Sequence, residues 1–304
     1  MVCVEILQLE LLGRQGKHQE MSVFALTFAY NESFFLRRWA AYYGSQLGLE
    51  NLFVLDHGSN DLSTTGLGPV NIIKVPRTSY DEVQRIFFAS FMHSALLQYY
   101  SSGFVMDVDE FIVADPTKYK NLRAFAETTQ ATALACIGLE LCHVRAVEPD
   151  FSESLPILSQ REHVYFDSWM CKRSFARAPI RFGGGFHTSD QPVEFDEGLF
   201  LIHLKNFDYR YRLVRQQITA NWNYSGDFGL HARRAAEYVN LVFDGVDSRL
   251  ASGNVSHDFN FKKEIELCVE RTAMNPSGEY DFNLDGGFQS PDLYLLPSYF
   301  HDLF

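Results

Sequence analysis

The run Gly103-Phe104-Val105-Met106-Asp107-Val108-Asp109-Glu110-Phe111-Ile112-Val113 places three carboxylates inside an otherwise apolar segment. The residues on both sides of the acids have the apolar character of strands buried in a sheet. A buried carboxylate is costly unless it is paired or bound to a metal ion. The run therefore predicts a strand that leaves the core at Met106 and turns Asp107 and Asp109 toward a cleft.

Further strands and helices are predicted on the N-terminal side of this run. Residues 23–28, 52–55 and 71–75 are short apolar stretches typical of strands buried on both faces. Apolar residues recur at helical spacing over about 36–47 and 81–100. Strands that alternate with helices in this way predict an α/β fold built around a sheet with crossover connections.

The remaining elements are predicted from turn formers and apolar runs. We expect a helix from Pro116 to about residue 128, strands at 131–144, 179–187 and 199–204, mainly helix over 209–250, and a tail from Asn275 that wraps the surface. On the helix at 81–100, one apolar face is expected to be shared by Val83, Ile86, Phe87, Phe91, Ala95 and Leu96.

Polar residues follow several of the predicted strands. Tyr30-Asn31-Glu32 follows the first strand, Asp56 the second, and Asp107 and Asp109 the strand at 103–106. Ligands of such sheets bind at the carboxyl ends of the strands. We therefore expect these three groups to line one cleft.

Composition limits the class of protein. The net charge of −12 argues against a nucleic-acid-binding surface, which requires a clustered basic face. The five cysteines lie at scattered spacings and indicate neither a zinc site nor a disulfide framework. No apolar run is long enough to span a membrane, and the N-terminus lacks the pattern of a signal peptide. We expect a cytoplasmic protein, and a peripheral contact with the inner face of a membrane stays open.

The two aspartates are suited to a hard divalent cation. Mg²⁺ and Mn²⁺ prefer oxygen ligands and keep positions open for substrate phosphates. A cation held in this way stabilises a departing diphosphate without any proton transfer. Asp107 and Asp109 therefore predict a metal site for a phosphate-bearing substrate.

The order of these motifs resembles a known family. Phe28-Ala29-Tyr30-Asn31-Glu32, Trp39, Asp56-His57-Gly58-Ser59-Asn60-Asp61 and Met106-Asp107-Val108-Asp109-Glu110-Phe111 follow one another in the chain. The series is similar to "K-N-E … W … H … D-x-G-S-x-D … D-x-D-E-F" of family 2-like and family 92-like glycosyltransferases with the GT-A fold. One departure is that Ala29 and Tyr30 replace the basic residue common before Asn-Glu.

The resemblance implies a nucleotide-diphospho-sugar transferase fold, with a mixed sheet flanked by helices and a mostly helical C-terminal extension. It also implies a hexosyltransferase with inversion, dependent on Mn²⁺ or Mg²⁺, as in polysaccharide biosynthesis. The donor would be a UDP- or GDP-sugar, and the acceptor a glycan, a lipid-linked glycan or a protein. Neither the oligomeric state nor the exact acceptor follows from the sequence.

Three parts of the chain are expected on this basis. Residues 1–20 form a leader, residues 21–215 the GT-A catalytic domain, and residues 216–304 a C-terminal helical extension and tail. Within the catalytic domain, residues 21–130 form the nucleotide-binding half and residues 131–215 the acceptor half.

The resemblance also assigns roles by position. Tyr30, Asn31, Glu32 and Asp56 would contact the nucleoside, Arg85 the base or phosphates, Asp107 the ribose and the metal, and Asp109 would be the principal metal ligand. His203, or alternatively His187 after the glycines 183–185, would complete the metal site. Lys172 and Lys205 would neutralise the diphosphate.

An inverting transfer also needs a carboxylate that deprotonates the acceptor hydroxyl. Asp167 is the favoured candidate because Tyr165, Phe166 and Trp169 flank it and aromatic rings stack on sugars. Glu140 and Asp190 are the alternatives.

Other functions compete with sugar transfer. A nucleotidyltransferase or phosphohydrolase would use the same pair of aspartates, although a sugar-activating nucleotidyltransferase needs a glycine-rich, basic loop after the first strand. A non-catalytic carbohydrate-binding or scaffold protein would use the acids only structurally.

Overall fold

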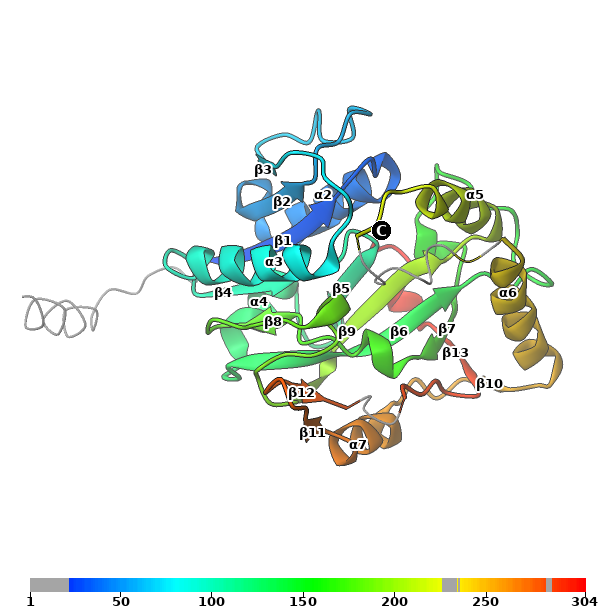
Figure 1. The fold of residues 1–304 in the computed structure, drawn as a ribbon. Coiled ribbons are helices and arrows are strands. Elements are labelled where there is room, and N and C mark those ends of the chain that lie inside the picture. Colours follow the sequence, from blue (N-terminus) through cyan, green and yellow to red (C-terminus); the bar gives the residue numbers. More distant parts are fainter. Residues whose placement is uncertain (1–21, 226–233, 235, 283–285) are drawn as a thin grey trace, which may run out of the picture.

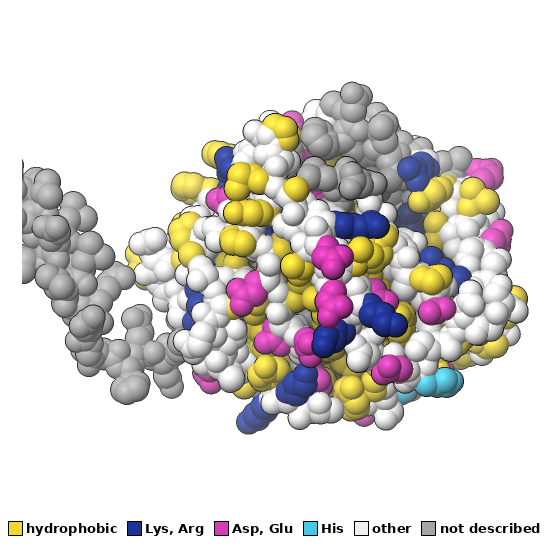
Figure 2. Space-filling view, turned by 90° about the horizontal axis from the view of Figure 1, so that it is seen from below, with side chains coloured by type: hydrophobic (Ala, Val, Ile, Leu, Met, Phe, Trp, Pro, Cys, Tyr) yellow, Lys and Arg dark blue, Asp and Glu magenta, His cyan; other side chains and the backbone are white. Residues whose placement is uncertain are grey.

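The computed structural model describes residues 22–225, 234, 236–282 and 286–304, so the expected leader of residues 1–20 lies outside the described residues. The described chain forms a large mixed sheet flanked by helices, which confirms the predicted fold class (Figure 1). No helix within these described ranges is long and apolar enough to cross a membrane. Acidic and basic side chains are mixed over the face that Figure 2 shows from below.

Four parallel strands make one half of the sheet, in the order β3-β2-β1-β4. They are β1 (Val23–Ala29), β2 (Leu52–Asp56), β3 (Asn71–Lys74) and β4 (Ser102–Val105), close to the predicted ranges. The helices α2 (Ser33–Leu47) and α3 (Glu82–Leu96) connect them. Because the strands are parallel, the residues that follow them meet at one edge of the sheet.

The helix α3 buries only part of the face expected: Ile86 and Leu96 pack against the core, whereas other residues of that face are exposed. Val83, Phe87 and Phe91 are 55%, 75% and 63% exposed, whereas Ala89 and His93 are fully buried. The prediction was wrong for the exposed residues because α3 is apolar on more than one side. Helical spacing alone does not say which of two apolar stripes meets the sheet.

The second half of the sheet is mostly antiparallel. Its strands are β5 (Glu110–Ala114), β6 (Ala133–Cys142), β7 (His163–Phe166), β8 (Phe175–Ala176) and β9 (Phe195–Asn206). The fully buried strand β6 pairs with β7 and β8 antiparallel and with β9 parallel. The strand β9 also pairs antiparallel with β5.

Two element predictions in this half were wrong. The helix α4 (Leu122–Thr128) begins after Asn121, whose side chain accepts from the backbone N–H of Ala124 at 2.8 Å, and not at Pro116. The segment 179–187 contains no strand but a 3₁₀ turn at Gly184–Phe186, where Gly185 has a φ of 61°. Glycine tolerates this left-handed backbone, which a strand does not contain.

The C-terminal part contains α5 (Tyr209–Ala220), α6 (Ala236–Ala251) and α7 (Lys262–Glu270) and the short strands β10 (Val255–Ser256), β11 (Ala273–Met274), β12 (Tyr280–Asp281) and β13 (Leu293–Leu295). Figure 1 shows α5 and α6 next to each other on one side of the molecule. The strand β13 joins the main sheet beside β7.

The tail runs along the surface over much of its described length, as expected, but its last residues enter the core. Phe300 is fully buried, and the ring centroids of Phe304 and Phe111 lie 4.3 Å apart. These aromatic residues pack into the same core as α2, because removing their apolar surface from water lowers the free energy of the folded chain. The surface prediction, made from the Gly, Pro and Asp content, was therefore wrong for the end of the tail.

Tyr43 fixes where β5 begins. Its hydroxyl accepts from the backbone N–H of Ile112 at 2.6 Å and donates to the carbonyl of Glu110 at 3.2 Å. Both contacts are buried, so α2 holds the start of β5 directly after the acidic run. The turn that carries Asp107 and Asp109 is thereby fixed between β4 and β5.

Candidate functional site

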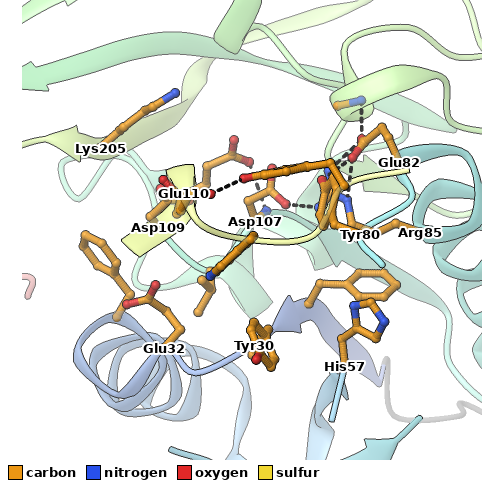
Figure 3. A pocket seen from close by; sticks show the side chains of 18 of the residues that line it. Tyr30, Glu32, His57, Tyr80, Glu82, Arg85, Asp107, Asp109, Glu110 and Lys205 are labelled. Atoms are coloured by element: carbon orange, nitrogen blue, oxygen red, sulfur yellow. Dashed lines mark hydrogen bonds and ion pairs between the residues drawn. The ribbon is translucent and has the colours of Figure 1, made fainter. Parts of the chain in front are cut away.

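A cavity of about 880 Å³ lies at the carboxyl ends of the parallel strands. It is lined by residues that follow β1, β2 and β4, by the end of β9, and by one face of α5. Among its residues are Asp107, Asp109, Glu110, Lys172, His187, His203 and Lys205 (Figure 3). Of the residues expected to line one cleft at the strand ends, Tyr30, Glu32, Asp107 and Asp109 line this cavity, whereas Asn31 and Asp56 do not.

Strand register brings His203 to the acidic run. His203 of β9 is the register partner of Glu110 in β5 and of Glu140 in β6. Its Nδ1 atom bonds to Oε1 of Glu140, and its Nε2 atom lies 3.6 Å from Oδ2 of Asp109. Burial lowers the pKa of His203, but Glu140 and Asp109 outweigh it and raise the pKa to about 10. An imidazolium therefore lies between two carboxylates at neutral pH.

Asp107 is held by two cations. Arg85 donates from Nη1 to its Oδ1 atom, and Nζ of Lys172 lies 3.2 Å from Oδ2. Lys172 also donates to Glu110 at 2.5 Å, and Arg85 to Glu82 at 2.8 Å. Burial raises the pKa of Asp107, but Arg85 and Lys172 prevail and the pKa falls below its ordinary value. Asp107 is therefore ionised at neutral pH, as a cation ligand must be.

The donor set fits a hard cation only in part. Both oxygens of Asp107 accept from protein cations, whereas Asp109 has a side chain 28% exposed and His203 as its ion-pair partner. No group of three or more His, Cys, Asp or Glu in the described ranges is arranged to hold a metal ion. Mg²⁺ and Mn²⁺ often bind through one or two carboxylates and complete their shell with water and substrate phosphates. The aspartates suit that open kind of site and no closed one.

The alternative ligand His187 also lines the cavity. Its Nδ1 atom lies 2.6 Å from the carbonyl oxygen of Trp169. Burial and the charge of Lys172 lower the pKa of His187 to about 3, so the ring is neutral and Nδ1 is the protonated nitrogen. The preceding loop approaches the site through Gly185, whose N–H donates to Glu82 at 2.7 Å.

An aromatic wall lies on the opposite side of the cavity from Lys205 (Figure 3). The guanidinium of Arg77 stacks 3.5 Å over Tyr30 and donates to Nδ1 of His57 at 2.9 Å. The rings of Tyr30 and Trp222 meet edge to face at 5.4 Å. Flat apolar faces with polar edges are the surfaces on which a nucleobase stacks.

The segment after α5 closes this wall by pairing with the chain before α3. The N–H of Tyr80 donates to the carbonyl of Asn223 at 2.7 Å, and the N–H of Ser225 donates to the carbonyl of Tyr80 at 2.8 Å. Tyr80 also donates to Glu82, which is bound to Arg85. Trp222 is therefore held at the cavity by this pairing after it and by its own N–H, which donates to the carbonyl of Thr219 at 3.1 Å.

Two of the expected nucleoside contacts do not line the cavity. Asp56 is fully buried, accepts from the N–H of Ser59 at 2.7 Å, and therefore orders the loop beneath the site. The side chain of Asn31 exchanges hydrogen bonds with Asn60 at 2.9 Å. In this structure the cavity wall at the end of β2 is His57, whereas Tyr30 and Glu32 line the cavity as expected.

None of the three candidate bases is among the residues that line the cavity. Asp167 accepts from the N–H of Trp169 at 2.9 Å and from Gln289 at 2.8 Å. Burial and the charge of Glu140 raise the pKa of Asp167 to about 6. Asp190 accepts from the N–H of Arg181 at 2.9 Å and belongs to the loop at 179–190.

Sequence reasoning missed most of the wall that α5 contributes. Tyr211, Arg212, Arg215, Gln216 and Thr219 line the cavity, and their spacing is that of one helix face. His57, Tyr80, Glu82 and Trp222 were also missed. The signal that could have found α5 is the pair of arginines three residues apart, shortly after the strand end with His203 and Lys205.

Comparisons with known proteins add little to this geometry. No protein-family model matches the chain, and no curated protein does. A solved structure described as mannose-1-phosphate geranyltransferase from Thermus thermophilus aligns with 73% of this chain and 68% of its own, at 10% identity and a TM-score of 0.28. A likeness of this size does not establish a shared fold or function.

Proposed function

We propose that the protein is a metal-dependent glycosyltransferase that moves a sugar from a UDP- or GDP-sugar to a hydroxyl group of a glycan, a lipid-linked glycan or a protein, with inversion. The observation that carries the proposal is that Asp107 and Asp109 line the same cavity as the aromatic wall of Tyr30 and Trp222. A nucleoside and a diphosphate have to be bound side by side in such an enzyme.

The donor would lie along the cavity from the aromatic wall to Asp109. Tyr30 and His57 offer faces and edges to the nucleoside, while Arg85 and Lys172 keep Asp107 ionised. Asp109 and Asp107 would hold Mg²⁺ or Mn²⁺, with the neutral His187, or His203 after loss of its proton to the bound cation's charge, as the further ligand. A bound cation would stabilise the charge of the departing diphosphate.

Asp167 is the proposed base. Its raised pKa, about 6, is suited to accept a proton near neutral pH. To reach an acceptor hydroxyl, the carboxylate would exchange its hydrogen bond with Gln289 for one with the acceptor. Glu140 is less suited because His203 and Asn206 already bind its two oxygens.

The loop after β1 favours sugar transfer over nucleotidyl transfer. A sugar-activating nucleotidyltransferase would need glycines and basic residues there, to cradle a triphosphate. The chain has Tyr30, Asn31 and Glu32 at this place, and Glu32 is bound to Arg215 of α5. The two reactions also differ in their products: sugar transfer releases a nucleoside diphosphate, whereas sugar activation releases pyrophosphate. A product assay therefore distinguishes them.

The experiment is calorimetric titration of UDP and GDP with and without Mn²⁺, followed by a hydrolysis screen over a panel of nucleotide sugars. We expect metal-dependent binding and the release of free sugar from one donor. Asp109→Ala should abolish the metal-dependent part and leave the fold intact. Asp150→Ala is the matched control because its side chain is 73% exposed. Unchanged nucleotide affinity in Asp109→Ala would contradict the proposal.

A further inference from the structure

Lys205 and Arg212 are cations of the cavity with no carboxylate partner among the residues that the structure describes. Arg85, Lys172 and Arg215 also line the cavity, and each is ion-paired. Lys205 and Arg212 make no side-chain hydrogen bond and no ion pair with any residue in the part of the chain that the structure describes. Arg212 is nevertheless only 6% exposed.

Unlike the buried Arg161, Arg212 has no side-chain hydrogen-bond partner among the described residues. Arg161 is fully buried, and its guanidinium donates to the carbonyl of Phe207 at 2.7 Å, to that of Gln160 at 2.8 Å and to Asp208 at 3.0 Å. No side-chain nitrogen of Arg212 is closed off from solvent in the described structure, and Arg212 lines the cavity. Unlike Arg161, it therefore offers unpaired N–H donors to an anion that enters the cavity.

Two elements bring the cations to the same place. Lys205 lies two residues after His203 in β9, so both side chains project from the same face of the strand. Arg212 lies in the first turn of α5, which follows β9 after a short turn capped by Asp208. The carboxylates whose charges act on both cations are those of Asp109 and Glu140. Figure 3 shows Lys205 on the Asp109 side of the pocket, away from His57.

We propose that Lys205 and Arg212 together bind a phosphate group of a substrate. A guanidinium presents paired N–H donors that match two phosphate oxygens, and an ammonium adds a compact charge. The phosphate has two conceivable sources, the diphosphate of the donor and a phosphorylated acceptor. The inference rests on the proposed function only in assigning the ligand to the nucleotide cavity, and its test needs neither metal nor sugar nucleotide.

The experiment is calorimetric titration in EDTA with inorganic pyrophosphate and, separately, glucose 6-phosphate. We compare the wild type with Arg212→Gln, Lys205→Met and Arg212→Lys. Arg210→Gln is the matched control, because Arg210 lies on the same helix and its side chain is 76% exposed. The wild type and the control should bind at least one of the two probes equally well.

Arg212→Gln and Lys205→Met should each weaken that binding about tenfold or more, as expected for a charge-assisted hydrogen bond. Arg212→Lys should recover part of it. Loss for pyrophosphate alone identifies the donor diphosphate as the source, and loss for glucose 6-phosphate alone identifies a phosphorylated acceptor. Loss for both identifies a phosphate site shared by the two probes.

Melting temperature distinguishes a binding role from a structural one. Because neither cation has a hydrogen-bond or ion-pair partner to lose among the described residues, both variants should melt at or above the wild-type temperature. The proposal is overturned if the wild type binds neither probe, or if Arg212→Gln and Lys205→Met bind as the wild type does. If phosphate binding holds but no nucleotide sugar is cleaved, the sugar-transfer proposal fails and this one stands.

Discussion

Nε2 of His203 lies 3.6 Å from Oδ2 of Asp109, and strand pairing fixes this separation. His203 faces Glu110 across β5 and β9, and the N–H of Leu204 donates to the carbonyl of Asp109 at 2.8 Å. The pairing of β5 with β9 therefore holds the positive charge of His203 beside the carboxylates of the acidic run. The proton of His203 is bound more tightly in the folded protein than in the unfolded chain.

This binding predicts a pH-dependent stability. The pKa of His203 rises from 6.5 to about 10 on folding, so its stabilising contribution is complete below about pH 6.5 and is lost as the pH rises toward 10. Between pH 7 and 9 the wild type should lose about 1.4 kcal/mol of unfolding free energy per pH unit from this group. Urea unfolding at several pH values measures the slope.

His203→Gln should remove most of that slope. His257→Gln, which changes an exposed histidine, should keep it. Parallel pH profiles of the wild type and His203→Gln would show that the imidazolium does not carry the ion pairs described here.

Asp167→Asn should stabilise the folded protein at neutral pH, whereas the loss of a salt bridge would destabilise it. Burial raises the pKa of Asp167 from 3.8 to about 6, so the folded protein loses stability as the pH rises through this range. The difference corresponds to an upper value of about 3 kcal/mol at 1.36 kcal/mol per pH unit. The asparagine should therefore stabilise the protein at pH 7 and leave its stability at pH 4 nearly unchanged.

The same variant tests the proposed base. If Asp167 accepts the acceptor proton, Asp167→Asn should fold more stably and yet transfer sugar at least a hundredfold more slowly. Unfolding free energies at pH 4 and 7 and turnover with a cleaved donor give the two readings. A variant with full turnover would exclude Asp167 and leave Glu140 and Asp190 to be tested.

Tyr43→Phe should destabilise the start of β5. Without the hydroxyl, the buried N–H of Ile112 loses its acceptor, and the carbonyl of Glu110 loses one donor. An unsatisfied buried polar group costs about 1–3 kcal/mol. Thermal unfolding measures the loss, and Tyr99→Phe, at a site 81% exposed, should show none. Equal stability of the two variants would contradict the role given to Tyr43.

The position of the acidic run could be predicted from the sequence because burial and charge conflict there. Phe104 and Val105 before the run and Phe111 and Ile112 after it are almost fully buried, as their apolar character requires. Such local patterns give strands β1, β2 and β4 to within a residue or two. They do not say which stripe of α3 meets the sheet.

The walls of the cavity could not be predicted in the same way. Arg212 and Trp222 reach the site only because β9 ends beside β5 and α5 then turns back over the strand ends. Asp56 was expected to face the nucleoside, yet it bonds to Ser59 inside its own loop. Whether a polar side chain turns outward or caps its own loop depends on local hydrogen bonding that spacing does not encode.

Trp222→Ala tests whether the aromatic wall binds the base while the Asp109 side of the cavity binds the phosphates. Trp222 meets Tyr30 edge to face at 5.4 Å and lies over Arg77, whereas Lys205 and Arg212 belong to the Asp109 side. Stacking of one base on an aromatic ring contributes about 1–3 kcal/mol, so UDP or GDP should bind about tenfold or more weakly. Pyrophosphate should bind to this variant as to the wild type, because it has no base to stack. Tyr99→Ala, at an aromatic site that is 81% exposed and outside the cavity lining, is the control and should leave nucleotide binding unchanged. An equal loss of pyrophosphate and nucleotide affinity in Trp222→Ala would mean that the segment after α5 supports the whole cavity, and the assignment of the aromatic wall to the nucleoside would then have to be given up.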